Sequence, residues 1–293
     1  MQKIVPHLWF DKEAKEASTF HTSLFANSKI KHISTITDTP SGDCDIVSFD
    51  LAGQAFMAMS AGPVFKFNPA ISLFVVFDNE EEIKTVWDKL IAGGQALMPY
   101  DTYPWAKKYG WLQDRYGLSW QLSWSEHHQL SQKITPLLMF TQALAGKTKE
   151  AVEYYTNIFP NSKIEMTVPY EKGEGDKEGF IKHSRFTLAG QGFMAMDSSG
   201  PHKFIFNEAI SFIVNCETQE EIDHYWGKLS AVPESEQCGW LKDKYGVSWQ
   251  IVPTAMNEMM ASGDKEKIAR VTQALLKMKK FNIAELERAA EGK

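Results

Sequence analysis

The chain contains one sequence written twice, and this internal duplication restricts the folds open to it. Residues 51–59 (LAGQAFMAM) return at 188–196 (LAGQGFMAM) with eight of nine positions identical. Residues 110–122 (GWLQDRYGLSWQL) return at 239–251 (GWLKDKYGVSWQI) with nine of thirteen identical. The copies are offset by 129 to 139 residues. This period is far too long for a solenoid, so we predict two tandem domains.

A polar stretch between the copies sets the predicted domain boundaries. We expect domain one at 1–128, domain two at 133–255 and a C-terminal helical extension at 256–293. The total of 293 residues suits two domains of ordinary size. In the extension, apolar residues recur at helical spacing among lysines and arginines. We therefore expect an amphipathic helix that docks on a domain through its apolar stripe.

Each copy contains the same order of short elements. A short apolar stretch at 5–10 or 135–140 is typical of a strand, and apolar residues at helical spacing follow it. Three strand candidates come next, and the pattern starts again at 70–77. Each copy is thus predicted to contain two β-α-β-β-β modules. The fold class is α+β.

Charge and cysteine content exclude several classes of protein. There are 31 Lys and Arg against 37 Asp and Glu, and the net charge of −6 argues against binding to nucleic acid. Three cysteines at irregular spacing indicate neither a disulfide framework nor a CxxC zinc site. No apolar run approaches the roughly 20 residues that cross a bilayer. We predict a cytoplasmic protein that does not contact a membrane.

Three segments carry a family resemblance. They are FDKEAKEASTFHTSLF at 10–25, GPVFKFNPAIS at 62–72 and GWLKDKYGVSWQIVP at 239–253. With the paired modules, they resemble the PhnB-like branch of the vicinal oxygen chelate superfamily, which includes glyoxalases, bleomycin-resistance proteins and extradiol dioxygenases. Members of this branch are often labelled 3-demethylubiquinone-9 3-methyltransferase domain proteins. The resemblance covers essentially the whole chain and implies two glyoxalase-like domains, each with a curved mixed sheet around a cavity.

The resemblance also implies where a metal would be held. Metal-dependent members use one ligand from each of the first, fourth, fifth and eighth strands of a domain. The first, fifth and eighth positions fall on His7 and Leu137, Ser72 and Ser211, and Gln121 and Gln250. The fourth falls in the FMAM segments, which have no carboxylate or imidazole. A transition metal needs three or four good donors, so we predict no metal site and no cofactor. A divalent metal in domain one remains the alternative.

The candidate ligand-binding residues are polar anchors and aromatic walls of the two cavities. They are Trp9, Ser72, Trp105, Trp111, Gln121, Ser211, Trp240 and Gln250. The glutamine amides can both donate and accept hydrogen bonds, although they could instead be buried against backbone. The tryptophans could equally be core residues. Trp105 belongs to an aromatic loop that is ten residues longer in copy one, which is interpreted as a lid or an interdomain contact.

For several other residues a structural role is a better explanation than a functional one. Asp114 and Asp243 precede Tyr-Gly in the repeated segment, which is typical of a turn. His183, with Arg185 two residues on, is interpreted as a surface residue of a strand, with pairing to an anionic ligand as the alternative. The glycine-rich segment at 171–179 is predicted to lie between strands, so methyltransferase activity is not expected.

These observations predict a protein that binds a small apolar or aromatic molecule without a complete metal site. The alternative is a metal-dependent enzyme of the isomerase, lyase or dioxygenase type. Its active site would lie in domain one, with His7 and Gln121 as the catalytic candidates. Domain two could also be a purely structural partner of domain one. A homodimer is left open.

Overall fold

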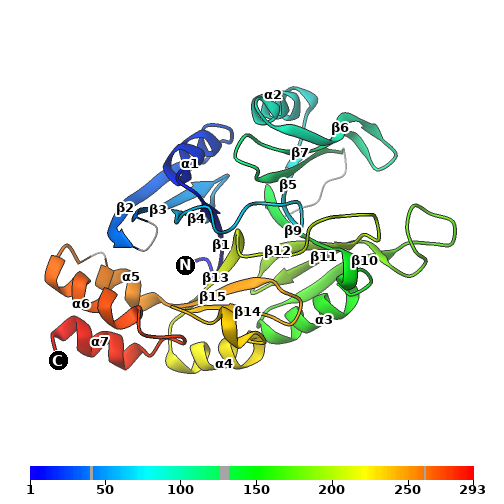
Figure 1. Ribbon diagram of the computed structural model, residues 1–293. Coiled ribbons are helices and arrows are strands. Elements are labelled where there is room, and N and C mark those ends of the chain that lie inside the picture. Colours follow the sequence, from blue (N-terminus) through cyan, green and yellow to red (C-terminus); the bar gives the residue numbers. More distant parts are fainter. Residues whose placement is uncertain (40–41, 126–131, 261) are drawn as a thin grey trace. The chain divides into compact units, whose positions relative to one another are not determined.

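The computed structural model describes residues 1–39, 42–125, 132–260 and 262–293 (Figure 1). It is an α+β structure in which a β-α-β-β-β module recurs along the chain, as predicted. The residues form two compact units. The larger unit is Pro6–Ile210, and the C-terminal unit is Ser211–Lys293 together with Met1–Val5. No helix in the described part of the chain has the length and apolar character that a membrane span requires.

The first two modules come from copy one. The first consists of β1 (Ile4–Phe10), α1 (Ala14–Thr22), β2 (Lys29–Thr39), β3 (Gly42–Leu51) and β4 (Gln54–Ser60). The second consists of β5 (Ile71–Phe77), α2 (Glu80–Ile91), β6 (Gln95–Tyr103), β7 (Ala106–Gln113) and β8 (Ser119–Trp124). The helices form where the sequence predicts them. In α2 the apolar stripe Ile83, Val86, Trp87 and Leu90 is buried, and the Asn79 side chain caps the first turn.

The third and fourth modules come from copy two. The third consists of β9 (Ile134–Phe140), a 3₁₀ turn (Gln142–Leu144), α3 (Thr148–Ile158), β10 (Lys163–Pro169), β11 (Ile181–Leu188) and β12 (Gln191–Asp197). The fourth consists of β13 (Ile210–Cys216), α4 (Gln219–Leu229), a 3₁₀ turn (Pro233–Ser235), β14 (Trp240–Lys242) and β15 (Ser248–Pro253). The fourth module departs from the predicted order, since it has the 3₁₀ turn where the others have a strand. This part of copy two is ten residues shorter than in copy one.

The eight-stranded sheet of the larger unit joins modules from different copies. Its strand order is β10-β11-β12-β9-β5-β8-β7-β6, so the second module of copy one shares a sheet with the first module of copy two. The junction is the antiparallel pair β5 and β9, in which Ser72 lies opposite Leu137. Met139 N donates to Ala70 O at 2.8 Å beside this pair. Residues of both copies therefore lie on each face of this sheet.

The first module forms a second group of strands in the larger unit. Its order is β1-β4-β3-β2, and β1 runs parallel to β4 with His7 opposite Met57. The first module thus does not share a sheet with the second module of its own copy.

The C-terminal unit contains β14-β15-β13 and the extension. The extension has three described helices, α5 (Thr254–Met260), α6 (Lys265–Leu275) and α7 (Ile283–Glu291), where the sequence predicted one amphipathic helix. The predicted helix is α6, whose Val271 is buried. The segment after α6 pairs with the strand edge, because Cys238 N donates to Met278 O and Gly239 N donates to Lys279 O, both at 2.8 Å.

The repeated aspartates have the structural role that the sequence indicated. Asp114 Oδ1 accepts from the backbone N–H groups of Tyr116 and Leu118, and Asp114 Oδ2 accepts from Trp120 Nε1 at 2.9 Å. Asp243 makes the equivalent bonds in copy two. In copy one, Nε2 of His21 in α1 also lies 2.7 Å from Asp114 Oδ2. This contact ties the first module to the turn of the second.

Candidate functional site

Three candidate residues of copy one lie on one face of the eight-stranded sheet. Trp111 lies opposite Gln121 in the β7–β8 pair. Gln121 lies opposite Phe74, and Ser72 is on the same face because it is two residues before Phe74. Trp111 Nε1 donates to Ser119 Oγ at 2.9 Å, and that hydroxyl lies 2.9 Å from Ser72 Oγ. Hydrogen bonds through Ser119 therefore link Trp111, the predicted cavity wall, to the predicted polar anchor Ser72, and the second anchor Gln121 lies on the same face.

Tyr109 fixes the orientation of the Gln121 side chain. The Tyr109 hydroxyl donates to Gln121 Oε1 at 2.9 Å, and both side chains are buried. Burial raises the pKa of Tyr109 above its usual range, so the phenol keeps its proton and remains a donor. Because the amide oxygen is occupied, Nε2 is the group of Gln121 that can bond to a ligand. Within the described residues, no acceptor is bonded to this Nε2.

Trp105 reaches this group only through tyrosines. It lies in the turn between β6 and β7 and is 60% exposed. Its ring stacks on Tyr103 at 5.0 Å between centroids, and Tyr103 meets Tyr109 edge to face at 5.5 Å. The long loop of copy one is thus a β-hairpin whose aromatic rings lead from the surface to Gln121. Its role as a lid stays a prediction.

The same face continues onto strands of copy two. Leu137 and Met139 of β9 and Met194 of β12 form a buried apolar cluster, and Met194 lies opposite Leu137. Partly buried apolar side chains pack against this cluster: Phe74, Trp111, Met196 and Phe204. We call these seven residues the apolar face. Of these seven residues, only Trp111 was a ligand-binding candidate from the sequence. The repeated FMAM segment was the available signal for two of the others, Met194 and Met196.

Arg185 of β11 also belongs to this face, because it lies opposite Met194 in the β11–β12 pair. Its Nε is buried and has no hydrogen-bond partner. The side chain lines a small recess with Thr135, Glu165 and Met194. Arg185 is therefore a partly buried residue of this face.

His7 and Trp9 lie elsewhere in the larger unit, on β1. His7 is buried, and desolvation lowers its pKa to about 3. Trp9 Nε1 donates to Gly62 O at 2.8 Å, and its ring meets Phe65 edge to face at 5.0 Å. The structure therefore does not place His7 and Gln121 in one sheet, because the modules pair across the copies.

The candidates of domain two form their own group in the C-terminal unit. Gln250 Nε2 donates to Ser211 Oγ at 3.0 Å, and Trp240 lies opposite Gln250 in the β14–β15 pair. Cys238 occupies the position of Tyr109, so this unit has no equivalent phenol to donate to Gln250 Oε1. The repeated Gln has a different hydrogen-bond partner in each copy for this reason.

The residues at the expected metal positions do not fit a metal. In the eight-stranded sheet these positions are Leu137, Met194, Ser72 and Gln121, which supply no carboxylate or imidazole. His7 lies opposite Met57, so a thioether occupies the fourth-strand position beside the imidazole. In the part of the chain that the structure describes, no group of three or more His, Cys, Asp or Glu could hold a metal ion.

The glycine-rich segment lies where the sequence predicted it. Residues 171–179 connect the antiparallel strands β10 and β11. They therefore do not form the strand-to-helix turn that is typical of nucleotide-type cofactor sites.

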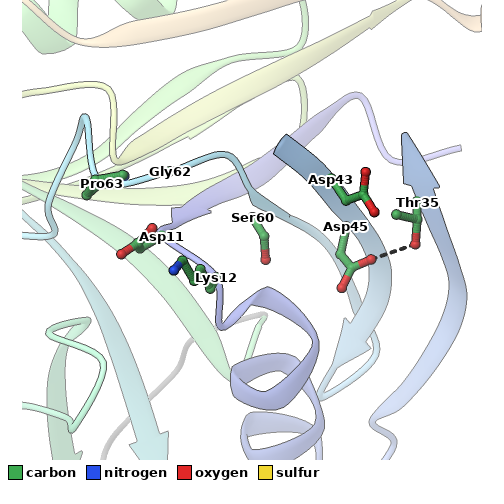
Figure 2. Close-up of a pocket in the computed structure, with 8 residues that line it drawn as sticks. All are labelled: Asp11, Lys12, Thr35, Asp43, Asp45, Ser60, Gly62 and Pro63. Carbon is green, nitrogen blue, oxygen red and sulfur yellow. Dashed lines mark hydrogen bonds between the residues drawn. The ribbon is translucent and has the colours of Figure 1, made fainter. Parts of the chain in front are cut away.

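A separate cavity of about 530 Å³ lies in the larger unit (Figure 2). Its lining is Asp11, Lys12, Thr35, Asp43, Asp45, Ser60, Gly62 and Pro63. The Thr35 hydroxyl donates to Asp45 Oδ1 at 2.6 Å. No candidate residue from the sequence is among these lining residues in the described structure. Three carboxylates against one ammonium disfavour an apolar or anionic ligand there.

Comparison with known proteins gives a consistent pattern. A family model described as 3-demethylubiquinone-9 3-methyltransferase matches residues 2–123 and 132–252. A Bacillus cereus PhnB protein with that description is 43% identical over 42% of this chain and 100% of its own, with a TM-score of 0.40. A Staphylococcus aureus protein is 31% identical over 42% of this chain and 97% of its own, with a TM-score of 0.19.

A more distant structure extends over nearly the whole chain. Glyoxalase I from Zea mays covers 89% of this chain and 97% of its own at 9% identity, with a TM-score of 0.58. This likeness shows the fold alone. No curated protein matches the chain.

Proposed function

The chain belongs to the 3-demethylubiquinone-9 3-methyltransferase family, a PhnB-like branch of the vicinal oxygen chelate superfamily, and on that premise we propose that it binds a small apolar or aromatic molecule without a metal. The binding surface is the apolar face of the eight-stranded sheet. The observation that carries the proposal is the combination of this face with one oriented amide. Ligand sites in proteins are mostly apolar and contain a few fixed polar groups.

The side chains of the apolar face suit a planar or flexible apolar ligand. Met139, Met194 and Met196 are soft and adaptable, and the partly exposed rings of Trp111 and Phe74 offer flat contact surfaces. Each of these residues is on a strand, so the surface is held by the sheet.

Methyl transfer is not part of the proposal. The family carries that name, but the glycine-rich segment at 171–179 joins two antiparallel strands. The proposal also excludes a metal-dependent step, because the side chains at the expected ligand positions are Leu137, Met194, Ser72 and Gln121.

The test is equilibrium binding of uncharged aromatic and quinone compounds, such as 1,4-naphthoquinone, followed by tryptophan fluorescence and calorimetry. We expect Met194→Ala to weaken binding several-fold, because Met194 is one of the three buried residues of the apolar cluster. The matched control is Met57→Ala, the same substitution at the corresponding position of copy one. Binding that is equally weak in wild type and both variants would contradict the proposal.

Elemental analysis of protein purified without chelator or affinity metal resin is the second test. We expect no stoichiometric metal in wild type. Near-stoichiometric metal that disappears in a His7→Ala variant would replace the proposal with a metal-dependent enzyme in domain one.

A further inference from the structure

Resting on the proposed function, we infer that the ligand is an organic anion. Its carboxylate, sulfonate or similar group binds Arg185, and its apolar body lies over Met194 and Leu137. Three observations support it: an arginine whose bonding capacity is unused, its register against the apolar cluster, and an excess of hydrogen-bond donors on the face.

The guanidinium of Arg185 has unused donors. An arginine has five N–H groups and accepts no hydrogen bonds. The Nε of Arg185 is buried without a partner. No residue in the described structure forms an ion pair, hydrogen bond or ring contact with this side chain. Since an unpaired buried donor costs free energy, an acceptor supplied by a ligand would offset that cost.

Arg185 stands beside the apolar cluster. It lies opposite Met194, and Met194 lies opposite Leu137 on the next strand. Neighbouring strands are about 4.8 Å apart, so two spacings, roughly 10 Å, separate the Arg185 and Leu137 backbones. A ring system with one anionic substituent spans that length. The anion and the apolar body can therefore be bound at the same time.

The acidic residue that lines the recess with Arg185 is paired elsewhere. Glu165 lines the same recess, but its carboxylate pairs with Lys163 at 3.2 Å. The recess itself measures about 10 Å³, which is room for about one water molecule. The ligand's anionic group must therefore meet the outer guanidinium nitrogens and not enter the recess.

The Gln121 amide, another polar group on the face, is also a donor there. Because Tyr109 donates to Gln121 Oε1, the amide offers its Nε2 to a ligand. Arg185 and Gln121 thus both favour ligands that accept hydrogen bonds. This pattern selects carboxylates, sulfonates and carbonyl compounds against amines.

The experiment compares two fluorescent probes with nearly the same aromatic body. One is 1-anilinonaphthalene-8-sulfonate, which carries an anion, and the other is N-phenyl-1-naphthylamine, which is uncharged. Both are titrated into the full chain and into Arg185→Gln. The control variant Lys182→Gln makes the same charge change three residues earlier on the same strand, where Lys182 pairs with Glu174 at 2.6 Å. Circular dichroism checks that each variant is folded.

We expect Arg185→Gln to weaken the sulfonate probe by about tenfold or more, because charge-assisted bonds to a guanidinium are strong. The uncharged probe should bind Arg185→Gln and wild type equally, and Lys182→Gln should resemble wild type with both probes. If both probes bind and Met194→Ala weakens them, but Arg185→Gln changes neither, the anion assignment fails and the proposed function survives. If neither probe responds to Met194→Ala, the proposed function fails as well.

Discussion

Removal of the Asp114 carboxylate should destabilise the larger unit strongly. This side chain is 3% exposed and accepts four hydrogen bonds. Two come from backbone N–H groups of its own turn, and two come from His21 and Trp120, which are both fully buried. In Asp114→Ala all four donors lose their acceptor at once.

The magnitude follows from the cost of unmade bonds. Each buried donor left without a partner costs about 1–3 kcal/mol, and the turn donors are nearer to water than the side-chain donors. We therefore expect Asp114→Ala to lower the free energy of unfolding by about 4 kcal/mol. Asp114→Asn keeps one acceptor oxygen for the turn but presents an NH₂ group to Trp120, which can only donate. Its expected cost is about 2 kcal/mol.

Urea unfolding of the full chain, followed by far-ultraviolet circular dichroism, measures the effect. The control is Asp88→Ala, because Asp88 is an exposed carboxylate on α2 that pairs with Lys84 at 2.6 Å. An exposed pair of this kind contributes under about 1 kcal/mol.

A double-mutant cycle separates the contact between modules from the turn. His21→Ala alone should lower the free energy of unfolding by less than Asp114→Ala does. The double variant should lower it by less than the sum of the two single changes. Equal losses in Asp114→Ala and Asp88→Ala would falsify the reasoning, since burial and bonding would then not matter at this position.

Three further outcomes are expected. Stability should fall by about 2 kcal/mol from pH 7 to pH 5 through His7, because its folded-state pKa of about 3 lies below the unfolded value of 6.5 and the unfolded chain takes up the proton first. Urea curves of His7→Leu should lack this part of the pH dependence. Gly239→Ala should lower the melting temperature more than Gly190→Ala: both glycines have positive φ, but only at Gly239 would the new Cβ lie 2.6 Å from the Phe281 ring. Asn79→Ala should cost about 1 kcal/mol in urea unfolding through the lost helix cap.

The modules could be predicted from the sequence because their signals are local. The apolar spacing in 83–90 places four side chains on one side of a helix, and the structure buries all four. The Asp-x-Tyr-Gly turns were predictable for a similar reason, since an aspartate bonds to backbone groups only a few residues away.

The candidate site was predictable only in part. Ser72, Trp111 and Gln121 were expected as ligand-binding residues of domain one, and strand pairing places all three on one face of the sheet. The orientation of the Gln121 amide was not predictable, because it depends on Tyr109 on the neighbouring strand. The position of Arg185 beside the apolar cluster was not predictable either, because it depends on which strands are neighbours. Arg185 lies opposite Met194 on β12, and Met194 lies opposite Leu137 on β9.

The sequence by itself determined the duplication, the α+β class, the order of strands and helices along the chain and the residues of copy one that share a strand face. Only the tertiary structure decided which module pairs with which. The strands IVPHLWF and ITPLLMF open the two copies with similar apolar patterns. Either could satisfy the backbone groups at the edge of β5, and local sequence cannot choose between them. The choice of β9 brings residues of both copies to one face and separates His7 from Gln121.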